Sequence, residues 1–254
     1  MWLFHHATGS GIVVGMSSSS STTPVPPAAG SGLRTPAPLS STPRSTLTRK
    51  KDRASTDRAD LHAVLDAGLV CHVALVSNGS PVCVPTGYGR DGETLYLHGS
   101  TGSGNVRAAG SGVDICVTVT IVDGIVYARS LNNHTFNYRC AVVHGRARPV
   151  TGDDERDHAL RVISEHLAPG SWDYARTPNA KELAGVAVLA LDLDEASVKM
   201  RGAEPGEQQE DVGTDDVWAG VVGVRTVFDP PKPASYVPGD LPVPPHIAER
   251  TPHP

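Results

Sequence analysis

The chain has 254 residues and a formal net charge of −5, and 19% of its residues are charged. Because Lys and Arg form no basic block that would bind phosphates, we expect no nucleic-acid partner. No stretch approaches the ~20 apolar residues of a membrane span, so we expect a soluble protein without membrane contact. The stretch Met1 to Gly15 lacks a basic n-region and an unbroken apolar run, which argues against secretion and favours a cytoplasmic protein.

Composition divides the chain into three parts. Residues 1–47 are dominated by Ser, Pro, Thr and Gly and predict a disordered lead, because they cannot bury enough apolar surface to offset the entropy of ordering. Within this lead, Met16 stands directly before a serine run and is a second candidate start. Residues 48–202 predict the folded part. Residues 203–254 form an acidic, Pro-rich extension in which the apolar segment 217–225 is expected to dock.

The first predicted elements are a helix and three strands. Residues 55–68 carry a cap-type start, Leu, Val and Leu at helical spacing, and a closing Gly, which predict a short amphipathic helix. Residues 69–90 form two β-rich runs around Asn78-Gly79, a strong hairpin signal. A third strand, 93–100, follows Asp91-Gly92.

The central part of the chain predicts further strands. Gly is too frequent in 101–112 for more than a short helical turn. Two runs around Asp123-Gly124 predict another strand pair, and 140–150 predicts a strand. Between them lies "YARSLNNHTFNYRC", residues 127–140, which we interpret as an unusually polar connection.

The last elements complete a mainly β fold. Residues 152–172 predict the longest helix, with acidic residues in its first turn and Leu160, Val162, Ile163 and Leu167 facing inward. Residues 185–202 supply one or two strands. Six or so short strands with hairpin turns and two helices predict a six-stranded antiparallel β-barrel, closed or partly closed, with flanking helices. An open two-layer sandwich is the alternative.

No metal site is expected. The four cysteines, at 71, 83, 116 and 140, lack the short spacing of a zinc site or redox pair and are predicted to be small core residues. The acidic helix contains Asp154, Asp157, His158 and Glu165, which a solvated helix face explains better than a metal centre.

A Gly- and Ser-rich turn follows the strand that ends near His98. Its small residues free the backbone N–H groups, Ser100 and Ser103 add hydroxyl donors, and Arg107 supplies charge, so the turn is suited to hold a phosphate. It matches neither a P-loop nor a Rossmann fingerprint, and a flexible connection is the alternative. His98 is either a structural strand-end residue or part of this site.

The polar connection is the second candidate region. His134 lies among Asn137, Tyr138 and Arg139, and polar side chains cost free energy if they are buried without partners. The segment is therefore either a solvated loop or a region that meets a ligand or a second subunit.

Four segments together resemble the pyridoxamine 5'-phosphate oxidase-like, FMN-binding split barrels, and within them the branch of flavin-nucleotide-binding proteins related to nitroimidazole-resistance reductases. They are "PTGYGRDGETLYLHGS", "VTVTIVDGIVYARS", "NHTFNYRCAVVHGRAR" and "EASVKMRGAEP" with "DDVWAGVV". The resemblance covers about Thr48 to Val224.

The resemblance implies a homodimer with FMN in clefts between the subunits, and it assigns roles to residues of this chain. The isoalloxazine would rest along the backbone of Val84, Pro85, Thr86, Gly87 and Tyr88. The phosphate would meet the turn with Ser100, Ser103 and Arg107, while His134, Asn137, Tyr138 and Arg139 would face flavin, substrate or the partner chain. His98 matches a strand-end His near the reactive centre and is the candidate catalytic residue.

One position departs from that pattern. Gly104 stands where the branch usually has Arg, and a missing charge-assisted hydrogen bond costs about 1.5 to 3 kcal/mol, or roughly ten- to a hundredfold in phosphate affinity. Arg107, Arg49 and Lys50 are the candidates to compensate.

The function implied is an FMN-dependent oxidoreductase that transfers hydride or electrons to a small molecule, possibly of the nitroaromatic type. Two alternatives stay open: the same barrel with deazaflavin F420, and a non-catalytic protein that holds flavin or haem, with His98, His134 or His144 as haem ligands. No Arg-x-His pair near the C-terminus supports oxidation of pyridoxamine phosphate itself.

Overall fold

Two antiparallel sheets and a few helices make up the computed structural model, which describes residues 38–39, 42–213 and 215–252. The predicted mainly β, antiparallel class with flanking helices is confirmed. Six or so strands were expected, whereas the described residues form eleven, of which two have only two residues each and two have only four. Most of the predicted disordered lead, residues 1–37 and 40–41, lies outside the described residues.

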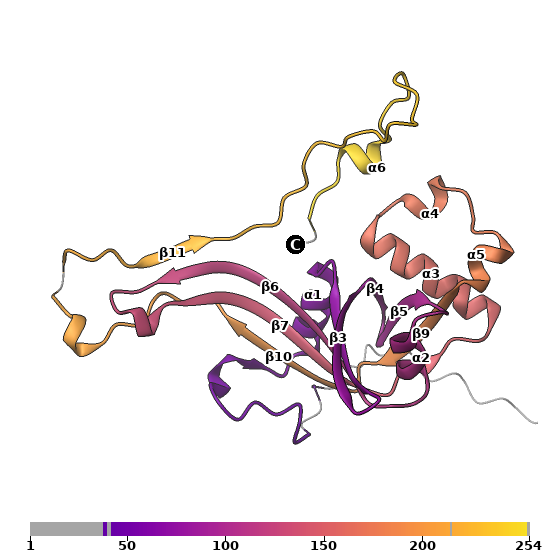
Figure 1. The fold of residues 1–254 in the computed structure, drawn as a ribbon. Helices are drawn as coiled ribbons and strands as arrows, with labels where there is room; N and C mark the ends of the chain where they lie inside the picture. The colour runs from indigo at the N-terminus through magenta and orange to yellow at the C-terminus, as the bar shows by residue number, and fades with distance from the viewer. Residues whose placement is uncertain (1–37, 40–41, 214, 253–254) are drawn as a thin grey trace, which may run out of the picture. The chain divides into compact units, whose positions relative to one another are not determined.

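The larger sheet has the strand order β1-β10-β7-β6-β2-β3, and β11 pairs with the outer part of β6. Figure 1 shows β6 and β7 as the long strands of the fold, with β10 beside β7. The strands of this sheet are β1 (Ala54–Ser55), β2 (Cys71–Ser77), β3 (Ser80–Thr86), β6 (Ile115–Tyr127), β7 (Thr135–Gly145), β10 (Glu195–Arg201) and β11 (Gly220–Gly223).

The smaller sheet has the order β4-β5-β9-β8, and all its pairings are antiparallel. Its central strand β5 pairs with β9 over seven residues. The strands are β4 (Tyr88–Asp91), β5 (Thr94–Ser100), β8 (Arg148–Pro149) and β9 (Val186–Asp192).

The helices are short except for α3. None of the helices in the described part of the chain is long and apolar enough to cross a bilayer. The α-helices are α1 (Arg58–Ala67), α2 (Gly104–Gly110), α3 (Asp153–Leu167), α4 (Ser171–Tyr174), α5 (Ala180–Ala184) and α6 (Pro245–Ala248), and the 3-10 turns are η1 (Lys51–Arg53), η2 (Leu131–Asn133) and η3 (Gln209–Asp211).

Local sequence signals account for the elements predicted best. Asn78 and Gly79 both have positive φ, 51° and 78°, as a two-residue hairpin turn requires, and they join β2 to β3. Asp57 caps α1 by accepting a hydrogen bond from the Ala59 N–H at 2.9 Å. The predicted hairpin and first helix are therefore confirmed.

The core lies where the helices cover the sheets. Leu61, Val64 and Leu65 of α1 are fully buried with the inner side chains of both sheets. Ala159 and Ile163 of α3 pack in a second cluster with residues of β5 and β9. Burying these apolar faces is the main driving force for the fold.

One residue of α3 does not face the core as predicted. Leu167 is 46% exposed, and His166 occupies the inward position of the last turn instead, its ring 4.5 Å from that of Tyr88. The Nε2 atom of His166 also lies 2.7 Å from the Gly68 carbonyl oxygen. A hydrogen bond and a ring contact thus fix the last turn, which an apolar pattern does not reveal.

The predicted strand pair around Asp123-Gly124 is wrong. Residues 115–127 form the single strand β6, with a β-bulge between Val122 and Gly124. The bulge lets Asp123 pair with Arg139 of β7, and a Cβ on Gly124 would lie 3.2 Å from the Val222 carbonyl oxygen of β11. Neighbours on both sides hold Gly124 in the sheet instead of a turn.

The predicted polar connection 127–140 is also shorter than expected, because β7 begins at Thr135. Only residues 128–134, including η2, join β6 to β7. We call the outer parts of β6 and β7, residues 122–139, together with β11, the arm; in Figure 1 it extends away from the smaller sheet.

Only one cysteine is a core residue. Cys71 is buried, and burial raises the pKa of its thiol to about 12. The prediction is wrong for Cys83, which is exposed, and for Cys116 and Cys140, which are half-buried. The register places these three on the outer face of the larger sheet, where small side chains suit a flat surface.

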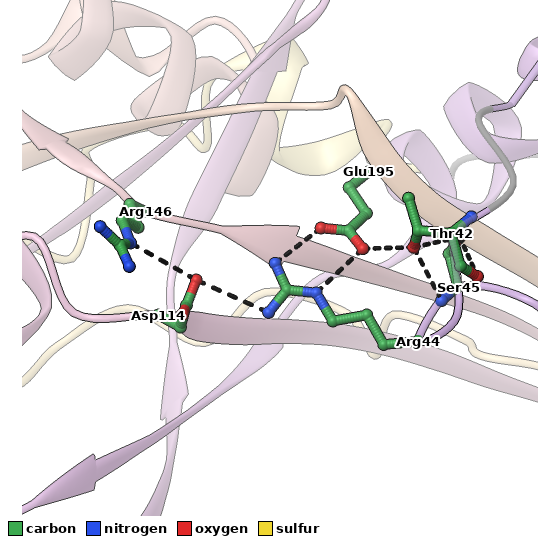
Figure 2. A network of polar contacts seen from close by, with 6 residues as sticks. All are labelled: Thr42, Arg44, Ser45, Asp114, Arg146 and Glu195. Carbon is green, nitrogen blue, oxygen red and sulfur yellow. Dashed lines mark hydrogen bonds and ion pairs between the residues drawn. The ribbon is translucent and has the colours of Figure 1, made fainter.

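A polar network fastens the segment before η1 to the larger sheet (Figure 2). Arg44 donates to both carboxylate oxygens of Glu195, at 2.9 and 2.6 Å, and Thr42 also donates to Glu195. The hydrogen bonds from Arg44 and Thr42 lower the pKa of Glu195 to about 2. The last residues of the predicted lead, 42–47, are therefore packed against the fold.

Candidate functional site

A narrow apolar crevice lies between the inner face of β2 and β3, the end of β5, and α2. Its lining joins residues predicted from different segments, since Val84, Thr86 and His98 all face it. The remaining lining residues are Val73, Leu75, Leu97, Asn105, Val106, Ala109 and Leu189.

The crevice is shallow within one chain. It encloses only about 30 Å³, enough for a couple of water molecules and far too little for a flavin ring. Val84 and Thr86, which line it, are only half-buried. One chain therefore supplies a wall along which a flat ring can lie, and a second surface is needed to enclose it.

His98 is the polar group of this wall. It lies in β5 opposite Val188 of β9, and its ring is half-buried. Its Nδ1 atom is buried and has no hydrogen-bond partner among the described residues. A buried polar atom without a partner is costly, so a ligand that supplied one would be bound favourably.

Gly87 and Tyr88 hold the backbone that faces His98. A Cβ on Gly87 would lie 3.1 Å from His98 Cε1, so the absence of a side chain lets the imidazole approach this backbone. Tyr88 is fully buried, and its hydroxyl donates to the Leu65 carbonyl and lies 2.9 Å from that of Gly68. Burial raises the tyrosine pKa, so Tyr88 offers a cofactor only its backbone.

The turn after β5 is compact. The Ser103 N–H donates to the Ser100 carbonyl at 2.9 Å, and the Ser103 hydroxyl caps α2 by accepting from the Val106 N–H at 3.4 Å. Arg107 folds back over the turn, where its Nη1 lies 3.1 Å from the Thr101 carbonyl oxygen and 3.2 Å from that of Gly102.

Arg107 is the main charge at this turn. Its guanidinium is exposed and has no carboxylate partner among the residues described. Because α2 has only seven residues, its dipole adds little, and attraction for a phosphate depends on Arg107.

A family model supports the resemblance. The model described as pyridoxamine 5'-phosphate oxidase matches residues 57–200, more than half of the chain and all but two of the strands. The chain belongs to the pyridoxamine 5'-phosphate oxidase family. The family predicted from the sequence is therefore confirmed, and the match includes the crevice, His98 and the turn with Arg107.

Two solved structures are similar to this member of the family over most of its length. The flavocytochrome Anf3 from Azotobacter vinelandii shares 35% identity, covering 82% of this chain and 96% of that chain, with a TM-score of 0.76. The FAD and heme binding protein from Mycobacterium smegmatis shares 37% identity, covering 78% and 96%, with a TM-score of 0.74. A comparison with curated proteins gives no match.

The second predicted group of site residues lies in the arm, and none of them lines the crevice of the same chain. The His134 Nδ1 lies 3.1 Å from the Ser130 carbonyl oxygen, and Tyr138 stacks on Phe136 with ring centroids 5.0 Å apart. Arg139 donates to Asp123 across the bulge. Within one chain these residues therefore lie away from the crevice.

Most of the polar side chains in this region hold the C-terminal extension. Asn137 accepts from the Ala203 N–H and donates to the Ala203 carbonyl, both at 3.2 Å, and Arg201 also donates to Asn137. Asn133 donates to the Gly206 carbonyl at 3.2 Å. Arg129 pairs with Glu207 at 2.5 Å.

Sequence reasoning missed this partner of the polar connection. A signal was present, because the segment after residue 203 is acidic while the connection carries Arg129 and Arg139. Opposite charges in two segments do not reveal which groups pair, so the contact between them was not predicted.

No group of three or more metal-ligating side chains occurs within the part of the chain that the structure describes. Of the acidic helix residues, His158 lies 2.8 Å from Asp91, and Glu165 accepts from the N–H groups of Gly170 and Trp172. These residues thus have structural partners.

Proposed function

We propose that this chain is a flavin-dependent redox protein that holds its flavin along the crevice beside His98 and passes hydride or electrons to a small molecule. The observation that carries the proposal is the buried, unpartnered Nδ1 of His98 in the apolar wall made by Val84 and Thr86. A flavin ring needs an apolar surface and a few polar groups at its edge, and this wall offers both.

The residues of the wall and turn fit a flavin nucleotide. Val84 and Thr86 line the crevice, the absence of a side chain on Gly87 lets His98 approach this wall, and Arg107 supplies the charge for a phosphate. When bound, the flavin supplies the hydride chemistry. His98 would donate or accept one hydrogen bond at the ring edge or at the substrate.

We further propose that the protein is a homodimer. In one chain the crevice is only a wall, and the predicted residues His134, Asn137, Tyr138 and Arg139 lie away from it. A second subunit would enclose the ring and bring an arm to the opposite side. The exposed apolar residues Val76 and Pro85, on the outer face of β2 and β3, add surface that suits a subunit contact.

Either FMN or FAD suits the turn with Arg107, since both carry a phosphate next to the ribityl chain. The sequence predicted FMN, whereas one of the similar structures is an FAD and heme binding protein. The titration described below distinguishes FMN from FAD and tests F420 as the alternative cofactor.

A haem in addition to the flavin is the second candidate, favoured by the printed names of both similar structures. Of the three predicted histidine ligands, His144 fits best. It lines a groove of about 400 Å³ on the outer face of the larger sheet, with Ala74, Val76 and Pro81 as apolar neighbours. Its ring has no hydrogen-bond partner within the described part of the chain, so a ring nitrogen is available.

The test uses the full chain, purified without added cofactor and titrated with FMN, FAD and F420. We expect a flavin absorption spectrum and tight binding of one flavin per subunit, with a dimer in native mass spectrometry. A protein that binds none of the three cofactors at micromolar concentration would contradict the proposal.

Two variants localise the flavin. Arg107→Gln removes the charge at the turn and is expected to weaken flavin binding by about ten- to a hundredfold. Arg146→Gln is the matched control, because Arg146 is an exposed arginine outside the crevice. Equal affinities in the two variants would place the phosphate elsewhere.

The haem is tested by adding haem to the full chain with and without flavin. We expect the Soret band of a histidine-ligated haem in the parent and its loss in His144→Ala. The control is His134→Ala, which changes a histidine of the arm. If His134→Ala loses the band and His144→Ala keeps it, the ligand assignment is wrong.

A further inference from the structure

A large cleft in the described part of the chain is separate from the crevice and is roofed by the C-terminal extension. It measures about 440 Å³, within the range of ~300 to 1,000 Å³ that small-molecule sites occupy. Its floor is Ile121 of β6 and Arg139 of the arm, one side is Leu69 after α1, and the roof is the stretch from Val224 to Phe228. It shares no lining residue with the crevice.

The roof is attached at several points. The Val224 N–H donates to the Asp123 carbonyl at 3.0 Å, continuing the pairing of β11 with β6. Further along, the His246 ring lies 5.0 Å from that of Tyr174 after α3. The Arg250 guanidinium lies 4.5 Å above the ring of Phe228, a cation–π contact that orients this wall.

The charged groups of the cleft favour an anion. Arg139 uses Nε and Nη2 to bind Asp123, at 3.1 to 3.3 Å, so this pair is neutral. Its Nη1 has no partner among the described residues, and neither has the guanidinium of Arg225. The lining therefore carries one net positive charge and two sets of unused N–H donors.

The apolar part of the lining favours a ligand whose uncharged part is hydrophobic. Leu69, Ile121 and Phe228 supply hydrophobic surface next to the two guanidinium groups. An arginine fork matches the plane of a carboxylate, and one net charge balances a monoanion. A phosphate dianion would leave a negative charge uncompensated beside Asp123.

We infer that this cleft binds a small apolar monocarboxylate, with its carboxylate on Arg225 and Arg139 and its hydrophobic body against Phe228 and Ile121. Within one chain the cleft and the crevice share no lining residue, so the inference can be tested apart from the proposed flavin function. Since the ligand contacts both the arm and the roof, its binding also holds the C-terminal extension in place.

The test is a calorimetric titration of the full chain with 2-naphthoate, using naphthalene-2-carboxamide as the uncharged control. We expect 1:1 binding of the carboxylate at concentrations below about 1 mM and at least about tenfold weaker binding of the amide. Equal binding of the two, or no binding of naphthoate in this range, would overturn the inference.

Two variants assign the site. Arg225→Gln removes an exposed charge and is expected to weaken naphthoate binding about tenfold or more, while Phe228→Ala removes the apolar wall and weakens both probes. Arg107→Gln is the control, because it lies at the crevice and is expected to leave naphthoate binding unchanged. The inference fails if Arg225→Gln binds naphthoate as the parent does, or if Arg107→Gln weakens it equally.

A second readout is protection of the extension. Naphthoate at saturation is expected to slow proteolysis after residue 224 in the parent and to have no effect in Arg225→Gln. Flavin absorption, recorded on the same samples, separates the two sites: a protein without flavin that still binds naphthoate contradicts the proposed function alone.

Discussion

The crevice and the arm are assembled from segments at very different distances along the chain. Around the crevice, His98, the turn with Ser103, and α2 follow one another directly in sequence. In the arm, Asn133 bonds Gly206 across 73 positions, and Arg129 bonds Asp211 across 82 positions. His98 and the turn beside the crevice thus come from one short stretch, although β2, β3 and Leu189 complete the lining. The arm depends on contacts that a distant segment supplies.

The two regions also differ in burial. The strands and helix that support the crevice belong to the cluster with Leu65, Tyr88 and Leu95, all fully buried. The arm exposes large side chains, with Val222 51% exposed and Ile125 38% exposed. We therefore expect changes near the core to affect global stability, and changes in the arm to affect local order. The following predictions test that contrast.

The largest effect is expected from Leu65→Ala in α1. Leu65 has no exposed surface, so its truncation leaves a cavity and costs about 2–5 kcal/mol of the free energy of unfolding, measured by urea denaturation. Val222→Ala in β11 is the comparison in the arm, where Val222 is half exposed and the expected change is within about 0.5 kcal/mol. Similar losses of unfolding free energy in Leu65→Ala and Val222→Ala would contradict the expected difference between the core and the arm.

The second largest loss of stability is expected from Gly89→Ala in β4. A Cβ at Gly89 would lie 2.6 Å from the Val162 carbonyl oxygen and 2.9 Å from the Ile163 Cα, so the backbone of α3 must move. We expect a loss of about 1–3 kcal/mol in the same denaturation experiment.

Gly104→Ala is the matched control for Gly89→Ala. Nothing lies within 4 Å of a Cβ at Gly104, and Ala favours the helix α2 that begins there, so stability is expected to stay equal or rise slightly. A larger loss of unfolding free energy for Gly104→Ala than for Gly89→Ala would show that close packing of β4 on α3 does not determine the effect of these substitutions.

In the arm, Asn137→Ala should release the C-terminal extension. Asn137 is buried and satisfies the Ala203 backbone and the Arg201 guanidinium, so its loss costs about 1–3 kcal/mol locally. We expect faster deuterium exchange in residues 203–213 and little change in α1. Asn133→Ala, with one hydrogen bond to Gly206, is expected to give a smaller increase. Uniform exchange across the chain would contradict a local effect.

The smallest effect is pH-dependent attachment of residues 42–47. The hydrogen bonds from Arg44, and then Thr42, lower the folded-state pKa of Glu195 from 4.5 to about 2. A lowered carboxyl pKa stabilises the fold above the unfolded-state value and loses that contribution as the pH falls from 4.5 towards 2. We expect deuterium exchange in residues 42–47 to increase over this range.

Glu195→Gln tests that assignment. It removes the titrating carboxylate, so residues 42–47 should exchange faster at neutral pH and show no further step between pH 4.5 and 2. If the parent shows no step either, the network in Figure 2 does not control attachment of this segment.

The sequence alone predicted the family, the antiparallel class and the elements that short-range signals specify. The Asn78-Gly79 turn requires positive φ at both residues, and the apolar spacing in α1 buries Leu61, Val64 and Leu65. The crevice followed from its sequence neighbours, because His98 and the Gly/Ser turn adjoin in the chain. These features depend on backbone preferences and periodicity, which a sequence displays directly.

Only the tertiary structure decided the features that depend on distant pairing. Asp123-Gly124 resembles a turn in the sequence, but the structure places it between β7 and β11. The hydrogen bonds of Asn137 with the Ala203 backbone likewise appear only in the structure. The same holds for the large cleft, whose floor and roof are about 85 positions apart, from Arg139 to Val224. The sequence shows that a polar side chain needs a hydrogen-bonding partner, but only the tertiary structure determines which group that partner is.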